Sequence, residues 1–404
     1  MSRSHLHMIR TLLLLFLHPF SPLICSDPIA LYLTWQRSPE STMTIQWITP
    51  LAEKEDLIEY RADENSPWLE ATGSHVVTPN NYPYLIHRTE LTQLQPDSAY
   101  SFRIGKTDPL FKFRTMPAEL TSAIHFVVGG DVYHDAISFV QQTNHRAAQV
   151  SPQFALLGGD LAYSSGSLTL FSEKFERWLE WLITWKMQMV TPEGYLIPLI
   201  PAIGNHDVLG GFDEAPENAQ FFYALFGMSK KQGYRVLDFG NYLSLLILDS
   251  GHTHPIDGKQ TAWLATQLAS RQSMPHKVAL YHVGAYPSVR SQNSKESELI
   301  RKNWVPLFEH YGLNVAFEHH DHAYKRTHLI LDGKIDPTGV LYMGDGAWGI
   351  AKPRTPKTPK ERWYLAKSSK AMHFISVSLS KNKRVFTAID SNGKVIDTYE
   401  QHLD

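Results

Sequence analysis

The chain contains almost no cysteine. Cys25 is the only thiol among the 404 residues, so disulfide scaffolds, thiolate zinc sites and iron–sulfur clusters are excluded together. An excess of one sign of charge is absent as well, because 38 Lys and Arg residues stand against 40 Asp and Glu residues, for a formal net charge of -2. Without a global electrostatic field, general binding to nucleic acid or to an anionic membrane is not expected.

Long apolar runs are also lacking. No unbroken run approaches the ~18 residues that a membrane-spanning helix needs, so no stable membrane span is expected. Hydrophobic residues nevertheless make up 43% of the chain and charged residues 19%, a balance that excludes intrinsic disorder and predicts packed cores. The length predicts two to three domains of roughly 150 residues each. Histidine is abundant, at 20 residues, so any bound metal is expected on His, Asp, Asn or Tyr ligands.

Residues 1–26 have the order of a secretory signal. Basic residues precede the apolar run Leu12–Leu17, and two prolines separate this run from a polar start at Ser26-Asp27. The order predicts a signal peptide and an exported protein, periplasmic or extracellular, although no small residues mark the cleavage site. Because Cys25 lies in this segment, the mature chain is expected to hold no thiol, which excludes a cysteine nucleophile.

Residues 27–117 are a series of short β-type runs separated by turn signals. Met43–Trp47, for example, alternates apolar and polar residues as a half-buried strand does. The segment Leu94–Tyr100 resembles the tyrosine corner of a fibronectin type III-like domain. We therefore expect a β-sandwich, followed by a linker at 116–118. The sequence shows no cluster of ligand-type residues here, so the sandwich is expected to be a spacer or packing partner without chemistry.

Residues 121–404 alternate strand-like apolar runs with helical signals. The clearest helical stripe joins Phe171, Phe175, Trp178 and Trp185, which recur at the spacing of one helix face. Alternating strands and helices predict a layered α/β domain.

In the same segment, five apolar runs end abruptly in residues that bind metals. The blocks that follow them are Gly129-Gly130-Asp131, Gly158-Gly159-Asp160-Leu161-Ala162-Tyr163, Gly204-Asn205-His206-Asp207, His282 and Glu318-His319-His320-Asp321-His322. In open α/β sheets, the carboxyl ends of the strands meet at one crevice. We therefore expect these loops, which are remote in sequence, to form a single metal site.

Each block alone is weak evidence, but the order of the blocks is specific. Asp, Asp-x-x-Tyr, Asn-His-Asp, His and His-x-His, all at strand ends, resemble the ligand blocks of the metallophosphoesterase superfamily. The tyrosine and the preceding sandwich make the chain similar to purple acid phosphatases over essentially its whole mature length. The resemblance implies a fibronectin type III-like sandwich at 27–117. At 121–404 it implies a calcineurin-like catalytic domain of the α/β class, with two mixed sheets flanked by helices.

The resemblance also implies two metal ions. The ligands of one ion, which is ferric iron in the family, would be Asp131, Asp160, Tyr163 and His322. The ligands of the other, a divalent iron, zinc or manganese ion, would be the same Asp160 as a bridge, with Asn205, His282 and His320. His206 looks like the family's phosphate-binding and proton-donating histidine, so Asp160, Asn205 and His206 are the expected catalytic residues.

The chemistry accounts for these residue types. Two cations about 3.5–4 Å apart can share a carboxylate and neutralise the attacking and leaving oxygens of an in-line phosphoryl displacement. The chain is therefore interpreted as an exported binuclear acid phosphatase that hydrolyses small phosphate monoesters by attack of metal-bound hydroxide. Two alternatives stay open: a phosphodiesterase or nucleotidase that uses the same site, and a secreted binding or adhesion protein with a degenerate phosphatase domain. The physiological substrate, the second metal and the oligomeric state are not predicted.

Four features depart from the family pattern or imitate it. Tyr133 stands where the first block usually has glycine, and it could compete for the metal; His319 replaces the glycine that usually opens the last block.

Gly251-His252-Thr253-His254 looks like a second copy of the last block. We expect it to be a loop at the pocket rim, with metal binding as the less favoured alternative. The basic, proline-rich run Lys352–Lys360 is expected to be a solvated loop, and the alternative is a lid that attracts anionic substrates.

Overall fold

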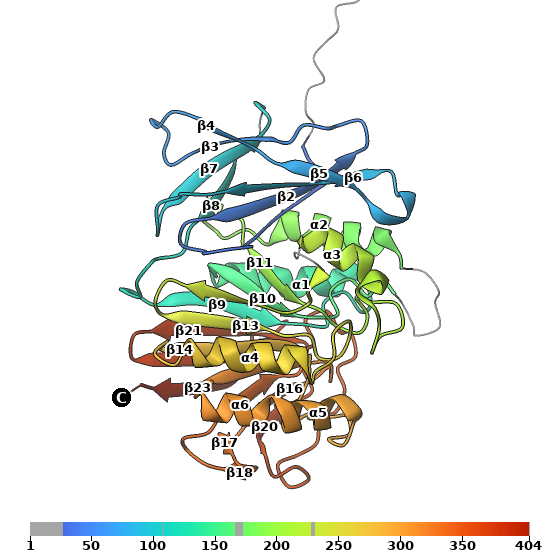
Figure 1. Ribbon diagram of the computed structural model, residues 1–404, viewed down its shortest axis with the longest axis vertical. Coiled ribbons are helices and arrows are strands. Elements are labelled where there is room, and N and C mark those ends of the chain that lie inside the picture. The colour runs from blue at the N-terminus through green and yellow to red at the C-terminus, as the bar shows by residue number, and fades with distance from the viewer. Residues whose placement is uncertain (1–26, 108, 166–172, 228–230, 404) are drawn as a thin grey trace, which may run out of the picture.

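The computed structural model describes residues 27–107, 109–165, 173–227 and 231–403. The predicted signal segment 1–26 and the predicted helix residue Phe171 lie outside the described residues. An N-terminal sandwich and a larger α/β unit follow one another along the chain (Figure 1). Among the residues that are described, no helix is long and apolar enough to cross a membrane.

The N-terminal unit is a sandwich of two antiparallel sheets, with strand orders β1-β2-β6-β5 and β4-β3-β7-β8. Its strands are β1 (Ala30–Thr34), β2 (Met43–Pro50), β3 (Leu57–Arg61), β4 (Leu69–Thr72), β5 (Ser74–Val77), β6 (Tyr84–Leu91), β7 (Ala99–Ile104) and β8 (Phe111–Arg114), with a short 3₁₀ turn η1 (Pro79–Asn81). The backbone N–H of Gln95 donates to the hydroxyl of Tyr100 at 2.9 Å. This contact is the predicted tyrosine corner, in which a tyrosine hydroxyl ties a strand to its preceding loop.

The α/β unit contains two mixed sheets that pack face to face. The six-stranded sheet has the order β11-β10-β9-β21-β22-β23, and the seven-stranded sheet has the order β12-β13-β14-β15-β19-β16-β20. The strands of the first sheet are β9 (Ile124–Gly129), β10 (Phe154–Gly158), β11 (Leu199–Ala202), β21 (His373–Ser380), β22 (Lys383–Asp390) and β23 (Val395–His402). Those of the second are β12 (Arg235–Phe239), β13 (Leu243–Ile247), β14 (His276–Val283), β15 (Val315–His319), β16 (Tyr324–Thr327), β19 (Leu341–Gly344) and β20 (Leu365–Ser369), and a small hairpin adds β17 (Ile330–Leu331) and β18 (Lys334–Ile335).

Helices cover the outer faces of both sheets (Figure 1). The six-stranded sheet is covered by α1 (Ile137–Gln149), α2 (Phe175–Gln188) and α3 (Gln220–Phe226), and η2 (Pro216–Ala219) precedes α3. The seven-stranded sheet is covered by α4 (Lys259–Ala269), α5 (Lys295–Asn303) and α6 (Val305–His310). The result is a helix–sheet–sheet–helix arrangement. It confirms the predicted α/β class with two mixed sheets flanked by helices.

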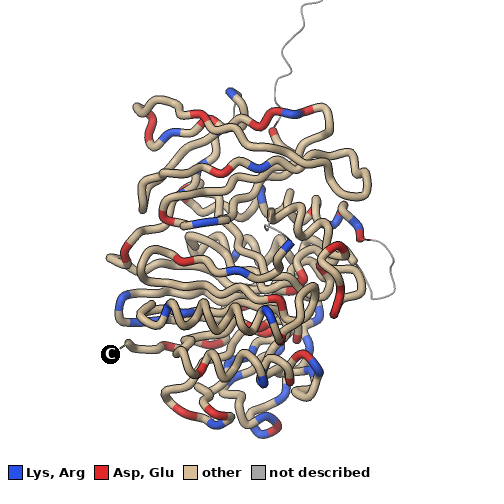
Figure 2. The backbone as a smooth tube through the Cα atoms, viewed as in Figure 1, with Lys and Arg blue, Asp and Glu red and all other residues tan. Residues whose placement is uncertain are grey.

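The sandwich is fixed to the α/β unit by buried contacts. The Tyr32 hydroxyl donates to the carbonyl of Leu225 at 2.6 Å, and the Gln36 amide donates to the carbonyl of Phe226 at 2.9 Å. The rings of Tyr32 and Phe226 also pack edge to face, 6.0 Å apart. Lys and Arg residues are interspersed with Asp and Glu residues along both units in Figure 2, in line with the balanced composition.

Candidate metal centre

The predicted ligand blocks lie at the carboxyl ends of parallel strands. β9, β10 and β11 run parallel in one sheet, and β14 and β15 run parallel in the other. The backbone N–H of Asp131 donates to the carbonyl of Gly159 at 3.0 Å, and that of Val132 donates to the carbonyl of Asp160 at 2.8 Å. These bonds tie the loop after β9 to the loop after β10, so their carboxylates are held side by side.

Five of the predicted ligands have a left-handed backbone. Their φ angles are +52° at Asp131, +53° at Asp160, +50° at Tyr163, +77° at His320 and +61° at His322. Residues other than glycine rarely adopt this conformation, and the resulting strain tends to persist at functional sites. The concentration of strained residues in these loops therefore marks the strand ends as a functional site, independently of any motif.

A first group contains Asp131, Tyr163 and His322, all of which are buried. The Tyr163 hydroxyl donates to Oδ1 of Asp131 at 3.0 Å and lies 3.2 Å from Nε2 of His322. That nitrogen lies 2.9 Å from the same Asp131 oxygen. Burial and the nearby carboxylate of Asp131 raise the pKa of the Tyr163 phenol well above its ordinary value. The phenol therefore keeps its proton unless a cation displaces it.

A second group contains Asp160, Asn205, His282 and His320. Nε2 of His282 lies 3.1 Å from Oδ1 of Asn205, 3.3 Å from Oδ2 of Asp160 and 3.0 Å from Nδ1 of His320. Asp160, His282 and His320 place their ligand atoms within 4.8 Å of one another. The ends of four strands, β10 and β11 of one sheet and β14 and β15 of the other, thus supply the ligand atoms of this group.

The hydrogen bonding of His282 fits a cation at that point. Its Nδ1 lies 2.9 Å from the carbonyl oxygen of Gly158. Because a carbonyl oxygen only accepts hydrogen bonds, Nδ1 carries the proton, and the neutral ring has its lone pair on Nε2. This lone pair faces oxygens of Asn205 and Asp160, which repel it unless a positive charge lies between them. Burial acts to lower the pKa of His282, but the charge of Asp160 outweighs it and raises that pKa to about 9. A positive charge beside Nε2 of His282, either a proton or a metal ion, is therefore needed to stabilise this arrangement.

Asp160 has the environment expected of a bridging ligand. Its Oδ1 accepts the backbone N–H of His206 at 2.7 Å, whereas its buried Oδ2 has no hydrogen-bond partner among the described residues and lies 3.3 Å from Nε2 of His282. Burial alone would raise its pKa, but His282 and His206 hold the pKa of this carboxyl well below its ordinary value. An ionised and buried oxygen without a donor is costly, and coordination to a metal ion would satisfy it.

His206 lies beside the first group. Its ring stacks on the ring of Tyr163, with centroids 4.5 Å apart, and its Nδ1 has no hydrogen-bond partner. The histidine therefore stands next to a predicted ligand with a ring nitrogen that no described protein group uses.

Sequence reasoning assigned no role to Asp207, which follows His206. Its Oδ1 accepts the backbone N–H of Leu161 and its Oδ2 accepts that of Gly204, both at 2.9 Å. Burial, followed by the charge of Asp160, raises the pKa of Asp207 to about 8. Asp207 positions the ligand loops after β10 and β11 relative to each other. The available signal was its spacing of three residues from Gly204, which suits a turn closed by an Asp side chain.

A buried ion cluster, also missed from sequence, supports the His320–His322 loop. Lys325 pairs with Glu318 and lies 3.1 Å from Oδ1 of Asp345, and all three side chains are inaccessible to solvent. Glu318 also accepts hydrogen bonds from the Tyr281 hydroxyl and the Ala285 backbone, both at 2.7 Å. The cluster thus links β14, β15, β16 and the end of β19 around the ligand loop.

Lys325→Met is expected to lower the free energy of unfolding by about 3–5 kcal/mol, because it leaves Glu318 buried without its counter-charge. Urea denaturation measures the change. Lys381→Met, at an exposed position, is the matched control and should leave stability nearly unchanged. Equal stability of the two variants would contradict a structural role for the buried pair.

His319 fills space left by two glycines. A Cβ atom added at Gly158 would lie 1.7 Å from Cδ2 of His319, and one added at Gly130 would lie 2.7 Å from its Nδ1. The ring is buried, and neither of its nitrogens has a hydrogen-bond partner in the part of the chain that the structure describes. Burial lowers the pKa of His319 to about 3, so the ring is neutral. The histidine that replaces the usual glycine is therefore a packing residue of the loops rather than an additional ligand.

Gly158→Ala is expected to destabilise the protein by about 1–3 kcal/mol, because the new methyl group overlaps the His319 ring and overpacks the site. Urea denaturation and metal content are the measurements. The double variant Gly158→Ala/His319→Ala should recover part of the loss, since it removes the ring that causes the overlap. A purely additive double variant would show that the two residues do not compete for this space.

Tyr133 points away from the ligands. Its hydroxyl donates to Glu180 on α2, and the guanidinium of Arg177 lies 3.9 Å from its ring centroid. The hypothesis that Tyr133 competes for the metal therefore finds no support in this geometry.

Gly251-His252-Thr253-His254 forms a closed turn. The Asp249 carboxylate accepts the backbone N–H groups of His252 at 2.7 Å, Thr253 at 2.9 Å and His254 at 3.0 Å. His252 is fully buried, and its ring nitrogens already contact the Gly211 carbonyl and the Ser250 hydroxyl, each at 3.0 Å. His252 therefore packs against His282 and does not line an exposed rim. Both of its ring nitrogens already have partners, so neither is free to bind a metal.

The basic run Lys352–Lys360 is exposed at its lysines, as expected of a solvated loop, but it also contacts the site. The backbone N–H of Arg354 donates to the carbonyl of His322 at 2.9 Å. Burial, followed by the charge of Arg290, lowers the pKa of the Arg354 guanidinium. A cavity of about 400 Å³, lined in part by His320, Arg290 and Phe212, opens beside the second group. Arg290 therefore lines the cavity beside His320, and Arg354 is tied to the same ligand loop through its backbone contact with His322.

Comparison with known proteins places this geometry in a family. Residues 28–115 match the purple acid phosphatase N-terminal domain, and residues 122–324 match the calcineurin-like phosphoesterases. The chain is 24% identical to purple acid phosphatase 18 of Arabidopsis thaliana over 347 residues, which cover 82% of this chain and 74% of that protein. It is 26% identical to purple acid phosphatase 22 of the same plant over 339 residues, which cover 78% and 72% respectively.

The fold is similar to that of a purple acid phosphatase from yellow lupin (Lupinus luteus) seeds. The TM-score is 0.75 over 93% of this chain and 74% of that chain, at 16% sequence identity, so this likeness concerns the fold alone. The two family matches follow each other in the order of the two structural units. The chain therefore belongs to the calcineurin-like phosphoesterase family, among the purple acid phosphatases, and is a hydrolase.

Proposed function

We propose that the protein is an exported acid phosphatase that hydrolyses small phosphate monoesters with a pair of metal ions. The observation that carries this proposal is the convergence of the seven predicted ligands into two adjoining groups, with Asp160 ionised and its Oδ2 without a hydrogen-bond partner among the described residues. A complete donor set argues against a degenerate domain in a binding protein. Export to the periplasm or the medium rests on the pattern of residues 1–26.

The residues present fit an unequal pair of ions. Asp160 and the first group, Asp131, Tyr163 and His322, would hold one ion, and their carboxylate and phenolate oxygens suit ferric iron. The second group, Asp160, Asn205, His282 and His320, offers two imidazoles beside a carboxylate and an amide oxygen, a mixed set that suits a divalent iron, zinc or manganese ion. When bound, such a pair supplies the nucleophile and the charge neutralisation of an in-line phosphoryl displacement.

The protein's own side chains are proposed to bind the ester and to move the proton. His206, whose half-buried ring stacks on Tyr163, is the group proposed to bind phosphate and to protonate the leaving alkoxide. Asn205 adds its amide oxygen beside His282. Arg290, which lines the cavity beside His320, and Arg354, whose backbone contacts His322, bring positive charge near the proposed ligands, which favours an anionic substrate.

The test compares 4-nitrophenyl phosphate with bis(4-nitrophenyl) phosphate across pH 4–8, with aerobically purified, metal-loaded protein. We expect the monoester to be hydrolysed faster, with an optimum on the acid side of neutrality. Faster cleavage of the diester would favour the alternative of a phosphodiesterase or nucleotidase. A folded, metal-loaded protein that hydrolyses neither ester contradicts the proposal.

Tyr163→Phe is expected to remove the visible absorption band of the iron-loaded protein, because a phenolate on ferric iron is the proposed chromophore. Tyr133→Phe is a close control, since that hydroxyl points to Glu180 instead. Visible spectra are recorded together with iron content. A Tyr163→Phe protein that keeps both its iron and its colour would rule out Tyr163 as an iron ligand.

A further inference from the structure

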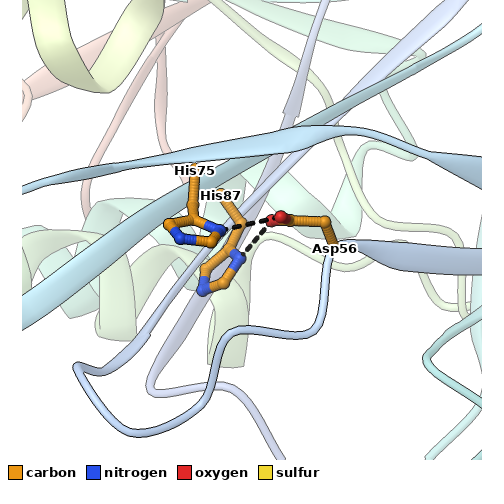
Figure 3. A group of neighbouring side chains, drawn as sticks. All are labelled: Asp56, His75 and His87. Carbon is orange, nitrogen blue, oxygen red and sulfur yellow. Dashed lines mark hydrogen bonds and ion pairs between the residues drawn. The ribbon is translucent and has the colours of Figure 1, made fainter.

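The N-terminal sandwich contains a second group of metal-ligating side chains: Asp56, His75 and His87 (Figure 3). Oδ2 of Asp56 lies 2.7 Å from Nδ1 of His75, and Oδ1 lies 2.7 Å from Nδ1 of His87. The ligand atoms of all three residues lie within 4.8 Å of one another. The expectation that the sandwich has no cluster of this kind is therefore wrong.

The backbone holds these three residues together. β5 and β6 are antiparallel neighbours, and His75 and His87 are directly paired in their register, so both side chains lie on one face of the sheet. Asp56 immediately precedes β3 of the opposite sheet. Its carbonyl accepts the backbone N–H of Gly73 and the hydroxyl of Thr89, both at 3.1 Å. The cluster thus joins an edge of one sheet to the other sheet.

The orientation of His87 is set by its surroundings. Its ring stacks on Trp47, with centroids 4.9 Å apart and planes 7° from parallel. Its Nε2 lies 2.7 Å from the hydroxyl oxygen of Thr49, and that hydroxyl donates its own proton to the carbonyl of Glu53 at 2.9 Å. Thr49 therefore accepts from Nε2–H of His87, and the neutral ring has its lone pair on Nδ1. This lone pair points at a carboxylate oxygen, the same arrangement that His282 has in the candidate metal centre.

We propose that Asp56, His75 and His87 bind a zinc ion in the sandwich, separate from the pair proposed for catalysis. Zinc takes two imidazoles and a carboxylate at about 2.0–2.2 Å, usually in tetrahedral geometry, so neighbouring donor atoms would be roughly 3.3 Å apart. Both contacts have to open by about 0.6 Å, which movement of the partly exposed side chains of Asp56 and His75, 16% and 28% exposed, can provide while His87 stays in place. Its exposed side leaves a fourth position for water. Bound zinc would pin the loop before β3 to the β5–β6 edge.

The test measures zinc content and the melting temperature of the whole protein after equilibration with excess zinc and removal of loosely bound metal. His75→Ala is expected to bind one zinc ion fewer per chain and to lose part of the zinc-dependent rise in melting temperature. Hydrolysis of the phosphate monoester should not change in this variant. Asp160→Asn should lose metal from the candidate metal centre and keep the sandwich zinc.

His125→Ala, at an exposed position outside the cluster, is the matched control for removing a histidine. Asp56→Asn preserves the shape of the side chain, so its zinc content provides a second test if His75→Ala does not fold. In Asp160→Asn, cobalt(II) should still give visible absorption bands, and adding Asp56→Asn should abolish them. Zinc content equal to wild type in both sandwich variants would overturn the proposal.

Discussion

Replacing Asp160 with Asn is expected to reduce kcat for a phosphate monoester by at least about a thousandfold. Asp160 is the one ligand proposed for both ions, and its loss both weakens metal binding and separates the charges that stabilise an in-line displacement. The amide is almost the same size as the carboxylate, so the fold should survive. Steady-state kinetics and metal content, measured on the same preparation, check the prediction.

Asp332→Asn is the control for this change, because the Asp332 side chain is 92% exposed. It should keep wild-type activity and metal content. An Asp160→Asn protein that retains more than about a tenth of wild-type turnover would argue that the carboxylate does not bridge two ions, since such a ligand is worth several kcal/mol of charge stabilisation.

Changing His206 to Gln is expected to lower kcat by about 10²–10⁴-fold for an alkyl phosphate, because an alkoxide needs a proton as it leaves. The loss should be much smaller for 4-nitrophenyl phosphate, since nitrophenolate leaves without protonation. The ratio of the two losses distinguishes a proton donor from a residue that only binds phosphate. Kinetics with both esters at several pH values provide the measurement.

His310→Gln, at an exposed position on α6, is the matched control and should affect neither ester. Equal losses for the two esters in His206→Gln would assign His206 to phosphate binding alone. Unchanged kinetics with both esters would remove it from the site altogether.

The sequence predicted the fold class and the residues that the structure brings together, because the relevant signals are local. Each ligand block follows its own apolar run, and the carboxyl ends of parallel strands share one edge of a sheet. Asp131, Asp160 and His282 could therefore be expected to converge before their distances were known. Their roles as metal ligands remain predictions that the substitutions above test.

Other features depend on contacts that no local pattern encodes. His75 and His87 meet only through the register of β5 and β6, and Asp56 reaches them from the opposite sheet. From the sequence alone, Lys325 would be expected on the surface, and only the structure shows that it is buried between Glu318 and Asp345. Predicting such contacts requires the tertiary packing of distant segments, and short-range periodicity does not supply it.

Anomalous X-ray diffraction from crystals of the metal-loaded protein tests the central claim most directly. Data collected at the iron and zinc absorption edges locate each ion and identify it. We predict two peaks about 3.5–4 Å apart on either side of Asp160, one among Asp131, Tyr163 and His322 and the other among Asn205, His282 and His320. A single ion, or none, in crystals of a preparation that hydrolyses the phosphate monoester would contradict the account.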